Sequence, residues 1–347
     1  MLRKPIFFIL FLFILSGCDH SPEYEVIYND EESEPTDVTT RPEENKKDPY
    51  TIAIVPKIDG IPYFNAVEEG ALEAGNDLGV KVLYTGPPTA NSEQQEAIIT
   101  KLIAKKVDVI AVSANDPYKL GSVLQKAKSK GIKVITWDSD TNASYRSFFV
   151  NMIDPEIIGR HVMDTLAIEM EEKGEYAIMT GSPTAANLNT WIDWIQIQQK
   201  EYYPTMKLVE VEYTNEDIHK AYAVTQNLLK KYPDLKGIIG VSTVNPPAVA
   251  QAVKDAGKIG KVAVVGTSTP NLMNAYLQEG AAQTITLWSP QKLGYLTVSL
   301  AKNLLNDEIP YDGQNIKNIG MIKFNGDMVI MGEPIDFTKG NVNQYDF

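Results

Sequence analysis

The chain has 347 residues, 44% of them hydrophobic, and its formal net charge is −13. A chain of this length usually holds about two domains, and its acidic balance disfavours nucleic acid as a partner, because phosphate contacts require a basic surface. One cysteine and three scattered histidines are too few for a cysteine-based zinc site, thiol catalysis or a histidine metal centre. We therefore expect no metal and no cofactor.

The first residues have the layout of an export signal. Arg3 and Lys4 precede an apolar stretch from Pro5 to Leu15, which is too short to span a bilayer because a span needs about 20 residues. This layout fits an ordinary signal peptide, in which the single cysteine that follows would be there by chance, and it also fits a signal peptide of a lipoprotein. The run LSGC, which ends at Cys18, resembles the lipobox of bacterial lipoproteins. The resemblance implies cleavage after residue 17, lipid on the Cys18 sulfur and an extracytoplasmic, membrane-anchored protein.

Residues 18–49 have the composition of a tether. Between residues 19 and 49 eleven acidic residues stand against three basic ones, which gives a formal charge of −8. Low hydrophobicity, prolines and self-repulsion favour an extended, solvated spacer. We expect this segment to separate the folded body from the membrane.

From Tyr50 onward, apolar strands alternate with amphipathic helices. Near-continuous apolar strands separated by helices are typical of parallel sheets that are covered on both faces. Two such series, restarting after residue 151, predict an α/β fold of two doubly wound parallel-sheet lobes. In chain order, the expected strands are 51–56, 81–85, 108–113, 133–137, 148–151, 175–180, 207–213, 237–242, 261–266 and 283–288, and the expected helices are 62–78, 92–105, 117–130, 154–172, 187–203, 216–231, 246–256, 270–279 and 290–305.

Polar residues follow the expected strands, at the sheet edge where ligands bind in folds of this kind. They include no glycine-rich phosphate loop and no histidine that could serve a nucleophile. This composition favours a binding site over a catalytic one. The candidates are Lys57, Asn115–Asp116, Asp138–Asp140, Ser182–Asn189, Thr243–Pro247, Ser268–Thr269 and Ser289–Gln291.

The motifs at these strand ends resemble type I periplasmic sugar-binding proteins of ABC transporters. The resemblance runs from about Thr51 to Phe347, and the branches most similar are the autoinducer-2-binding proteins of the Lsr system and the rhamnose-binding proteins. The matching motifs are VPK at 55–57, VSANDP at 112–117, TWDSD at 136–140, SPT at 182–184, GTSTP at 266–270 and YDF at 345–347.

The resemblance implies two lobes joined by a three-strand hinge, with the ligand in the cleft between them. We expect residues 50–151 and 292–320 in the N-terminal lobe, and residues 152–291 and 321–347 in the C-terminal lobe. The expected partners are a small sugar-like ligand and a membrane permease, and the expected state is a monomer.

The resemblance also assigns ligand contacts. In the autoinducer-2 branch a lysine and an aspartate contact ligand, and these fall on Lys57 and Asp138. An Asp-Gln pair falls on Asn187 and Leu188, so one carboxylate becomes an amide and one amide becomes apolar. A segment that contributes mostly backbone falls on Pro247 and Val249.

Further candidates come from the chemistry of the residues themselves. A sugar hydroxyl both donates and accepts, which suits amides and carboxylates such as Asn115, Asp116 and Gln291. Tyr63 and Phe64 offer an aromatic face for the apolar side of a sugar ring. Several candidates also fit structural roles: Asp116 could cap a helix, Phe64 could be core, and Gln291 could cap a helix.

We therefore expect a lipid-anchored, non-enzymatic receptor for autoinducer-2 or a related sugar such as rhamnose or ribose. One alternative is a sensor component that hands its closed complex to a signalling receptor. Another is a sugar-acting enzyme that uses Asp138 and Asp140 as acid and base. For Asp140, and for Trp191 and Trp194, a structural role competes with ligand binding.

Overall fold

The computed structural model describes residues 49–347. The expected signal peptide over residues 1–17, the lipidated Cys18 and the acidic tether up to residue 48 lie outside the described residues. No helix within the described part is long and apolar enough to cross a membrane.

Within the described residues, the first lobe is built on a seven-stranded sheet in the order β13-β14-β5-β4-β3-β1-β2. All neighbours run parallel except β13 and β14, which form an antiparallel hairpin. The central strand β3 is buried along its whole length, as expected for a strand covered on both faces. The strands are β1 (Thr51–Val55), β2 (Lys81–Tyr84), β3 (Val109–Val112), β4 (Lys133–Trp137), β5 (Phe149–Asn151), β13 (Lys323–Asn325) and β14 (Met328–Ile330).

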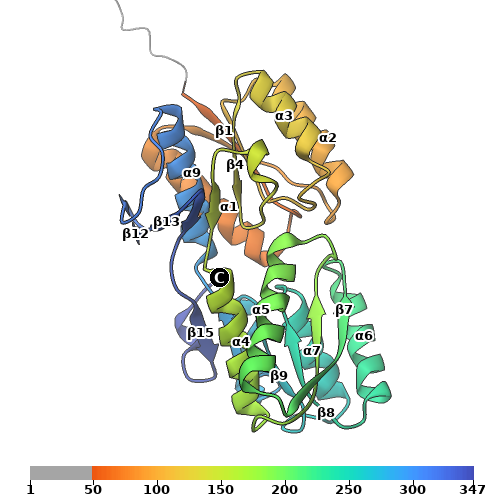
Figure 1. The fold of residues 1–347 in the computed structure, drawn as a ribbon. Helices are drawn as coiled ribbons and strands as arrows, with labels where there is room; N and C mark the ends of the chain where they lie inside the picture. Colours follow the sequence, from red (N-terminus) through yellow and green to blue (C-terminus); the bar gives the residue numbers. More distant parts are fainter. Residues whose placement is uncertain (1–48) are drawn as a thin grey trace, which may run out of the picture. The chain divides into compact units, whose positions relative to one another are not determined.

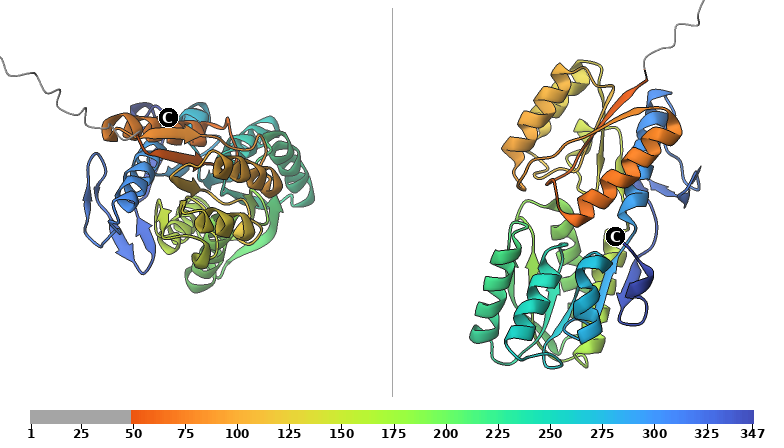
Figure 2. Two further views of the ribbon diagram at one scale, coloured as in Figure 1. Left: turned by 90° about the horizontal axis from the view of Figure 1, so that it is seen from above. Right: turned by 180° about the vertical axis from the view of Figure 1, so that it is seen from behind.

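Helices cover both faces of this sheet (Figures 1 and 2). One face carries α2 (Ser92–Ala104) and α3 (Gly121–Ser129), and the other carries α1 (Pro62–Leu78) and α9 (Pro290–Leu305). Helices α1 and α9 approach so closely that a Cβ on Gly70 would lie 1.9 Å from the Gln291 carbonyl oxygen. Only glycine permits this contact, so helix α9 is fixed to the first lobe although it follows the second lobe in the chain.

The second lobe has a six-stranded sheet within the described chain, in the order β15-β10-β9-β8-β6-β7. Only β15 runs antiparallel to its neighbour. Helices α4 and α5 pack together on one face, and α6, α7 and α8 pack in a row on the other (Figures 1 and 2). The strands are β6 (Gly174–Thr180), β7 (Met206–Tyr213), β8 (Leu235–Gly240), β9 (Ala263–Gly266), β10 (Thr284–Leu287) and β15 (Ile335–Thr338), and the helices are α4 (Pro155–Glu169), α5 (Ala186–Tyr202), α6 (Ile218–Lys231), α7 (Asn245–Asp255) and α8 (Pro270–Glu279).

Three segments connect the lobes: residues 152–154, 288–289 and 331–334. Two of them lie side by side, because the Met331 amide donates to the Asn151 carbonyl at 2.9 Å and the Gly332 amide donates to the Met152 carbonyl at 3.3 Å. The expected two doubly wound lobes with a three-strand hinge are therefore confirmed.

One expected lobe boundary needs correction. We expected residues 321–347 in the second lobe, but β13 and β14 pair in the first sheet beside β5. After α9, the chain stays in the first lobe until it crosses to the second lobe at residues 331–334. The error has a physical cause: strands of three residues carry too little periodicity to be assigned to a sheet from sequence.

The expected elements up to residue 305 occur in the expected order, and several are shorter than expected. The helix expected over 117–130 begins at Gly121, because the Asp116 carboxylate accepts from the Tyr118 and Lys119 amides and holds residues 117–120 in a turn. The remaining elements are small: β11 (Asn315–Ile316), β12 (Gly320–Met321), and the 3-10 turns Ala143–Tyr145 and Val342–Gln344.

Candidate functional site

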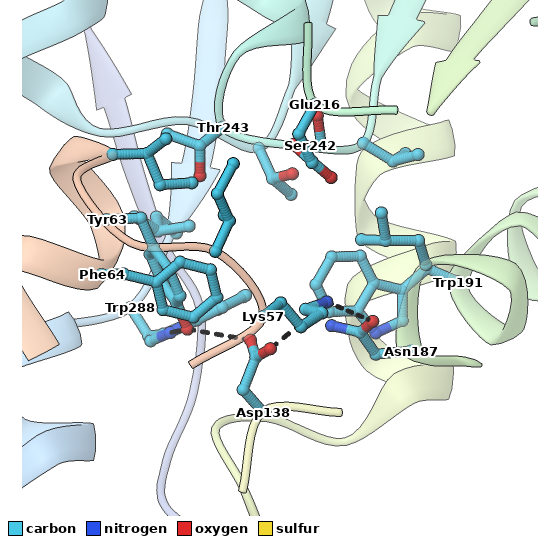
Figure 3. A pocket seen from close by; sticks show the side chains of 16 residues that line it. Lys57, Tyr63, Phe64, Asp138, Asn187, Trp191, Glu216, Ser242, Thr243 and Trp288 are labelled. Atoms are coloured by element: carbon cyan, nitrogen blue, oxygen red, sulfur yellow. Dashed lines mark hydrogen bonds and ion pairs between the residues drawn. The ribbon is translucent and has the colours of Figure 1, made fainter. Parts of the chain in front are cut away.

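A cavity lies between the lobes, at the carboxyl ends of strands from both sheets (Figure 3). Its volume is about 40 Å³, enough for a few water molecules and much less than a sugar ring. Binding of any sugar therefore requires the lobes to separate and the lining side chains to move. The lining residues are Lys57, Ile58, Ile61, Tyr63, Phe64, Asp138, Asn187, Leu188, Trp191, Glu216, Val241, Ser242, Thr243, Thr267, Leu287 and Trp288.

Asp138 is the centre of the first-lobe side of this cavity. It follows β4 directly and adopts a left-handed backbone with φ of 58°, which turns its carboxylate into the cleft. Its Oδ1 accepts from the Tyr63 hydroxyl at 3.1 Å, and its Oδ2 accepts from the Ser113 hydroxyl at 2.6 Å. The Lys57 ammonium lies 3.3 Å from Oδ2. A buried carboxylate is thus held by two hydroxyls and one cation.

Tyr63 links Asp138 to the hinge. Its hydroxyl donates to Asp138 and accepts from the Trp288 indole N–H at 3.1 Å, and Trp288 lies in the crossing segment 288–289. Burial raises the pKa of Tyr63 well above its ordinary value, and the Asp138 carboxylate raises it further. The phenol therefore stays protonated and remains a hydrogen-bond donor.

Two hydrogen bonds cross the cleft from lobe to lobe. The Lys57 ammonium donates to the Asn187 side-chain oxygen at 3.0 Å, and the Thr184 hydroxyl donates to the Asn115 carbonyl at 2.8 Å. Figure 3 shows Lys57 between Asp138 and Asn187, with a contact to each. Lys57 is therefore the side chain that directly joins the polar groups of the two lobes.

On the second-lobe side, Glu216 contributes a second carboxylate. It follows β7, and both Asn215 and Glu216 have left-handed backbones, with φ of 57° and 61°. Burial raises the pKa of the Glu216 carboxyl and Asp138 adds to the rise, whereas Lys57 and Ser242 oppose it. Among residues 49–347, no cation lies within ion-pair distance of Glu216, so its oxygens remain available to a ligand.

Aromatic and aliphatic side chains form most of the remaining wall. Tyr63, Phe64, Trp191 and Trp288 meet edge to face, with ring centroids 5.0 Å apart for Tyr63–Phe64 and 5.7 Å for Trp191–Trp288. Ring faces suit the C–H face of a sugar, and they exclude water from the charged groups. The aliphatic part of the wall consists of Ile58, Ile61, Leu188, Val241 and Leu287.

Six of the eleven expected ligand residues line the cavity: Lys57, Tyr63, Phe64, Asp138, Asn187 and Leu188. Asn115 and Asp116 are buried beside it but serve the loop. The Asn115 side chain donates to the Lys57 carbonyl at 2.7 Å, and Asp116 caps residues 118 and 119. The structural alternative stated for Asp116 is thus the one that its contacts support.

Three expected contacts do not line the cavity. Pro247 and Val249 are buried within α7, where Val249 has no exposed surface. The residues of this segment that line the cavity come earlier, at Ser242 and Thr243. Gln291 lies in the first turn of α9, and its carbonyl contacts α1 at Gly70. Ligand contact by these three residues stays a prediction, because in this structure Pro247 and Val249 pack within α7 and Gln291 packs against α1.

Asp140 has a structural role. Its two carboxylate oxygens accept from Arg146 at 2.9 and 2.6 Å, and Arg146 also donates to Asp327 at 2.7 Å in the β13–β14 connection. The carboxylate does not line the cavity with Asp138. The pair therefore lacks the shared site that an acid and base would need.

Sequence reasoning missed several lining residues. Trp191 was expected to pack and instead forms cavity wall, while Trp194 lies under the Arg160 guanidinium at 4.9 Å. Glu216, Leu287 and Trp288 were not proposed as ligand contacts. Glu216 had a usable signal, because it follows a strand end like the other candidates. Within residues 49–347, no group of three or more His, Cys, Asp or Glu could hold a metal ion.

Comparison with known proteins agrees with this geometry. Residues 52–309 match the periplasmic binding protein domain family. The chain belongs to this family. Its members are binding proteins, so the expectation of a non-enzymatic receptor is confirmed, as is the expected resemblance to type I periplasmic sugar-binding proteins.

Matches to individual relatives cover most of this chain. LsrB from Clostridium saccharobutylicum, solved in complex with AI-2, is 25% identical with a TM-score of 0.80, and the match covers 86% of this chain and all of that one. A solute-binding protein from Clostridium phytofermentas with bound L-rhamnose is 30% identical with a TM-score of 0.81, covering 85% and 98%. The D-xylose-binding periplasmic protein of Escherichia coli is 24% identical, covering 78% and 81%.

Proposed function

We propose that this chain is the lipid-anchored substrate-binding component of an ABC importer, and that it binds autoinducer-2 or a related small sugar such as rhamnose or ribose. The observation that carries the proposal is the cluster of Lys57, Asp138 and Tyr63 at the strand ends, within an aromatic cleft. A carboxylate accepts and an ammonium donates, so together they satisfy both functions of sugar hydroxyls.

The charge of the site supports a neutral ligand. One ammonium, on Lys57, faces the two carboxylates of Asp138 and Glu216, and no arginine is among the lining residues. Sugar acids and sugar phosphates would add negative charge to a cleft whose one ammonium is already paired with Asp138. The two structural relatives described above were solved with ligands of the proposed kind, AI-2 and L-rhamnose.

Closure of the lobes provides the link to transport. The cavity is too small for a sugar while Lys57 contacts Asn187, so the ligand enters an open form and replaces this contact as the lobes close. The closed monomer then presents both lobes to the permease. Lipid on Cys18 would keep the receptor near the membrane that holds this partner.

Calorimetry on the purified protein tests the binding proposal. We expect at least one of autoinducer-2, rhamnose and ribose to bind with micromolar affinity or better, and Asp138→Ala to abolish that binding. Failure of the wild-type protein to bind any of the three would overturn the sugar proposal. Turnover of a bound sugar would contradict the non-enzymatic role.

Cell fractionation tests the anchor separately. Cys18→Ser removes the sulfur that would carry lipid, so we expect the variant to leave the membrane fraction. Its ligand affinity should stay unchanged, because the cleft is formed by residues from Lys57 onward. Membrane retention of the variant would contradict the lipid anchor without affecting the binding proposal.

A further inference from the structure

A second cavity lies between the lobes, beside the cavity described above. Its volume is about 180 Å³, whereas that of the first cavity is about 40 Å³. A cavity of about 150 Å³ holds a benzene ring, so the second cavity has room for a ring-sized group and the first does not. We call the second cavity the side cavity. Phe149 and Met328 line it from the first lobe, and Asn187, Thr190 and Trp191 line it from the second.

Two side chains, those of Asn187 and Trp191, separate the two cavities, because they line both. No other residue of the described chain is shared between the two linings. Asn187 and Trp191 are four residues apart on α5, so they lie on one face of the helix, and Figure 3 shows them on the same side of the first cavity. They form a partition with open space behind it.

Trp191 is held less firmly than the other aromatic side chains of the wall. The Trp288 indole N–H donates to the Tyr63 hydroxyl, and that hydroxyl donates to Asp138. Within residues 49–347 the Trp191 indole N–H has no hydrogen-bond partner. Its ring meets Trp288 edge to face, a contact that a sugar ring can replace. Displacing Trp191 therefore breaks no hydrogen bond.

Asn187 is held from the opposite lobe. Its side-chain oxygen accepts from the Lys57 ammonium at 3.0 Å, and an entering ligand replaces this contact. Asn187 also lies in the first turn of α5, where Ala185 occupies the cap position and supplies no side-chain hydrogen bond to the helix. An uncapped first turn is easier to displace than a capped one. Ligand entry thus releases the second member of the partition.

We propose that the closed receptor makes room for its sugar by moving Asn187 and Trp191 into the side cavity. The inference rests on the proposed function and deepens it, because it names the residues that position the ring. The ring then lies between the Lys57–Asp138 pair and the displaced Trp191, which covers its C–H face. The size of the side cavity limits the size of the ring that the closed form accepts.

Filling the side cavity tests the proposal. Met328→Trp adds an indole at a residue that lines the side cavity but not the first cavity. Trp191 then has no space to enter, so affinity for the tightest ligand among autoinducer-2, L-rhamnose and ribose should fall roughly 10- to 100-fold in calorimetry on the purified protein. Met321→Trp is the matched control: Met321 is 77% exposed on β12, so this variant should bind like the wild type.

A second background distinguishes a blocked side chain from lobes that are held apart. Trp191→Phe leaves a smaller ring that needs less space, so adding Met328→Trp to it should weaken binding by at most about threefold. If the new indole only holds the lobes apart, the loss is the same in both backgrounds. Thermal unfolding shows which variants are folded, and Thr190→Trp, from an exposed position of α5, fills the same cavity if Met328→Trp does not fold.

The outcomes separate this inference from the proposed function. Wild-type affinity in a folded protein with a filled side cavity would overturn the movable partition and leave the sugar receptor intact. An equal loss of affinity in the wild-type and Trp191→Phe backgrounds would overturn the partition as well. Binding of no sugar by the unmodified protein would overturn both proposals.

Discussion

On the first-lobe face of the cleft, Asp138 has a partner for each carboxylate oxygen, whereas on the second-lobe face the buried Ser242 hydroxyl makes no hydrogen bond of ordinary geometry within the described chain. Glu216 likewise lacks an ion-pair partner there. The first face is therefore organised before ligand arrives. The second face gains its polar partners when the lobes close on the ligand, which makes closure dependent on ligand chemistry.

The two faces of the cleft also share a backbone feature. Asp138 and Glu216 each follow a strand, and each has a left-handed backbone that turns its carboxylate into the cleft. Such conformations cost about 1–3 kcal/mol for residues other than glycine, and aspartate adopts them more readily than glutamate. Glu216 shares this conformation with the neighbouring Asn215.

The largest effect should come from Asp138→Asn. It removes the charge but keeps a residue type that tolerates the left-handed backbone. Ligand affinity should fall about 100-fold through loss of charge-assisted hydrogen bonds, and the free energy of unfolding should fall by about 1–3 kcal/mol because Lys57 loses its anion. Calorimetry and denaturant unfolding measure the two changes.

Asp140→Asn is the matched control for that variant. Asp140 lies two residues away and pairs with Arg146 outside the cavity, so stability should fall while affinity stays near the wild-type value. An affinity loss equal to that of Asp138→Asn would show that the loop as a whole, and not the Asp138 carboxylate, determines binding.

Glu216→Gln should weaken binding about tenfold without destabilising the protein. Burial raises the pKa of Glu216 above its ordinary value of 4.5, so the folded state holds its proton more tightly than the unfolded state. Its contribution to stability is complete below pH 4.5 and is lost as the pH rises through the raised pKa. The variant should therefore equal or exceed wild-type stability at pH 7 and lose any advantage near pH 4, as measured by denaturant unfolding. Marked destabilisation at pH 7 would show that Glu216 already has a stabilising partner.

Ser242→Ala should have a smaller effect that is confined to the bound state. The hydroxyl makes no hydrogen bond of ordinary geometry, and its contact with Glu216 only lowers the pKa of that carboxyl, so the melting temperature should change little. Affinity should fall about three- to tenfold, the contribution of one neutral hydrogen bond. Calorimetry measures the ligand affinity of this variant, and an unchanged affinity would mean that the ligand does not reach the hydroxyl.

The smallest effect concerns His161 and Asp336, a second-lobe pair away from the cleft with 2.8 Å between Nε2 and Oδ1. The hydrogen bond to Asp336 raises the pKa of His161 above 6.5; burial raises the pKa of Asp336, but the bonds from His161 and Thr286 bring it below 3.8. The pair therefore stabilises the fold between about pH 4 and pH 6.5. That stability is lost as the pH rises through the raised pKa of His161, or falls through the lowered pKa of Asp336.

His161→Gln measures this contribution. The variant should be less stable than wild type by up to about 1 kcal/mol at pH 6, because the pair is partly exposed, and the difference should shrink at pH 8.5. Ligand affinity should not change at either pH. A stability difference that is the same at both pH values would exclude the charged pair as its source.

The fold could be predicted from the sequence because its elements are long and strongly patterned. Apolar strands such as β1 and β3, and proline-initiated helices such as α1 and α9, occur where they were expected. The short strands β13 and β14 were assigned to the wrong lobe, because their sheet is determined by pairing with β5 and not by their own residues.

The site could be predicted only in part. Lys57 and Asp138 were found because polar residues after parallel strands converge at one sheet edge. Asn115 and Asp116 satisfied the same rule yet serve the loop, since an amide or carboxylate can also satisfy backbone groups nearby. Trp191 and Trp288 have the pattern of core residues, and sequence cannot tell an aromatic that packs from one that lines a cavity.

The sequence by itself determined the two α/β lobes, the acidic character and the cluster around Asp138, because these follow from local periodicity and from residues next to strand ends. Only the tertiary structure decided which second-lobe groups face that cluster. Glu216, Leu188 and Trp288 come from three separate elements, and their meeting depends on how the lobes pack. The lining of the cavity is therefore a property of the closed cleft and of no single segment.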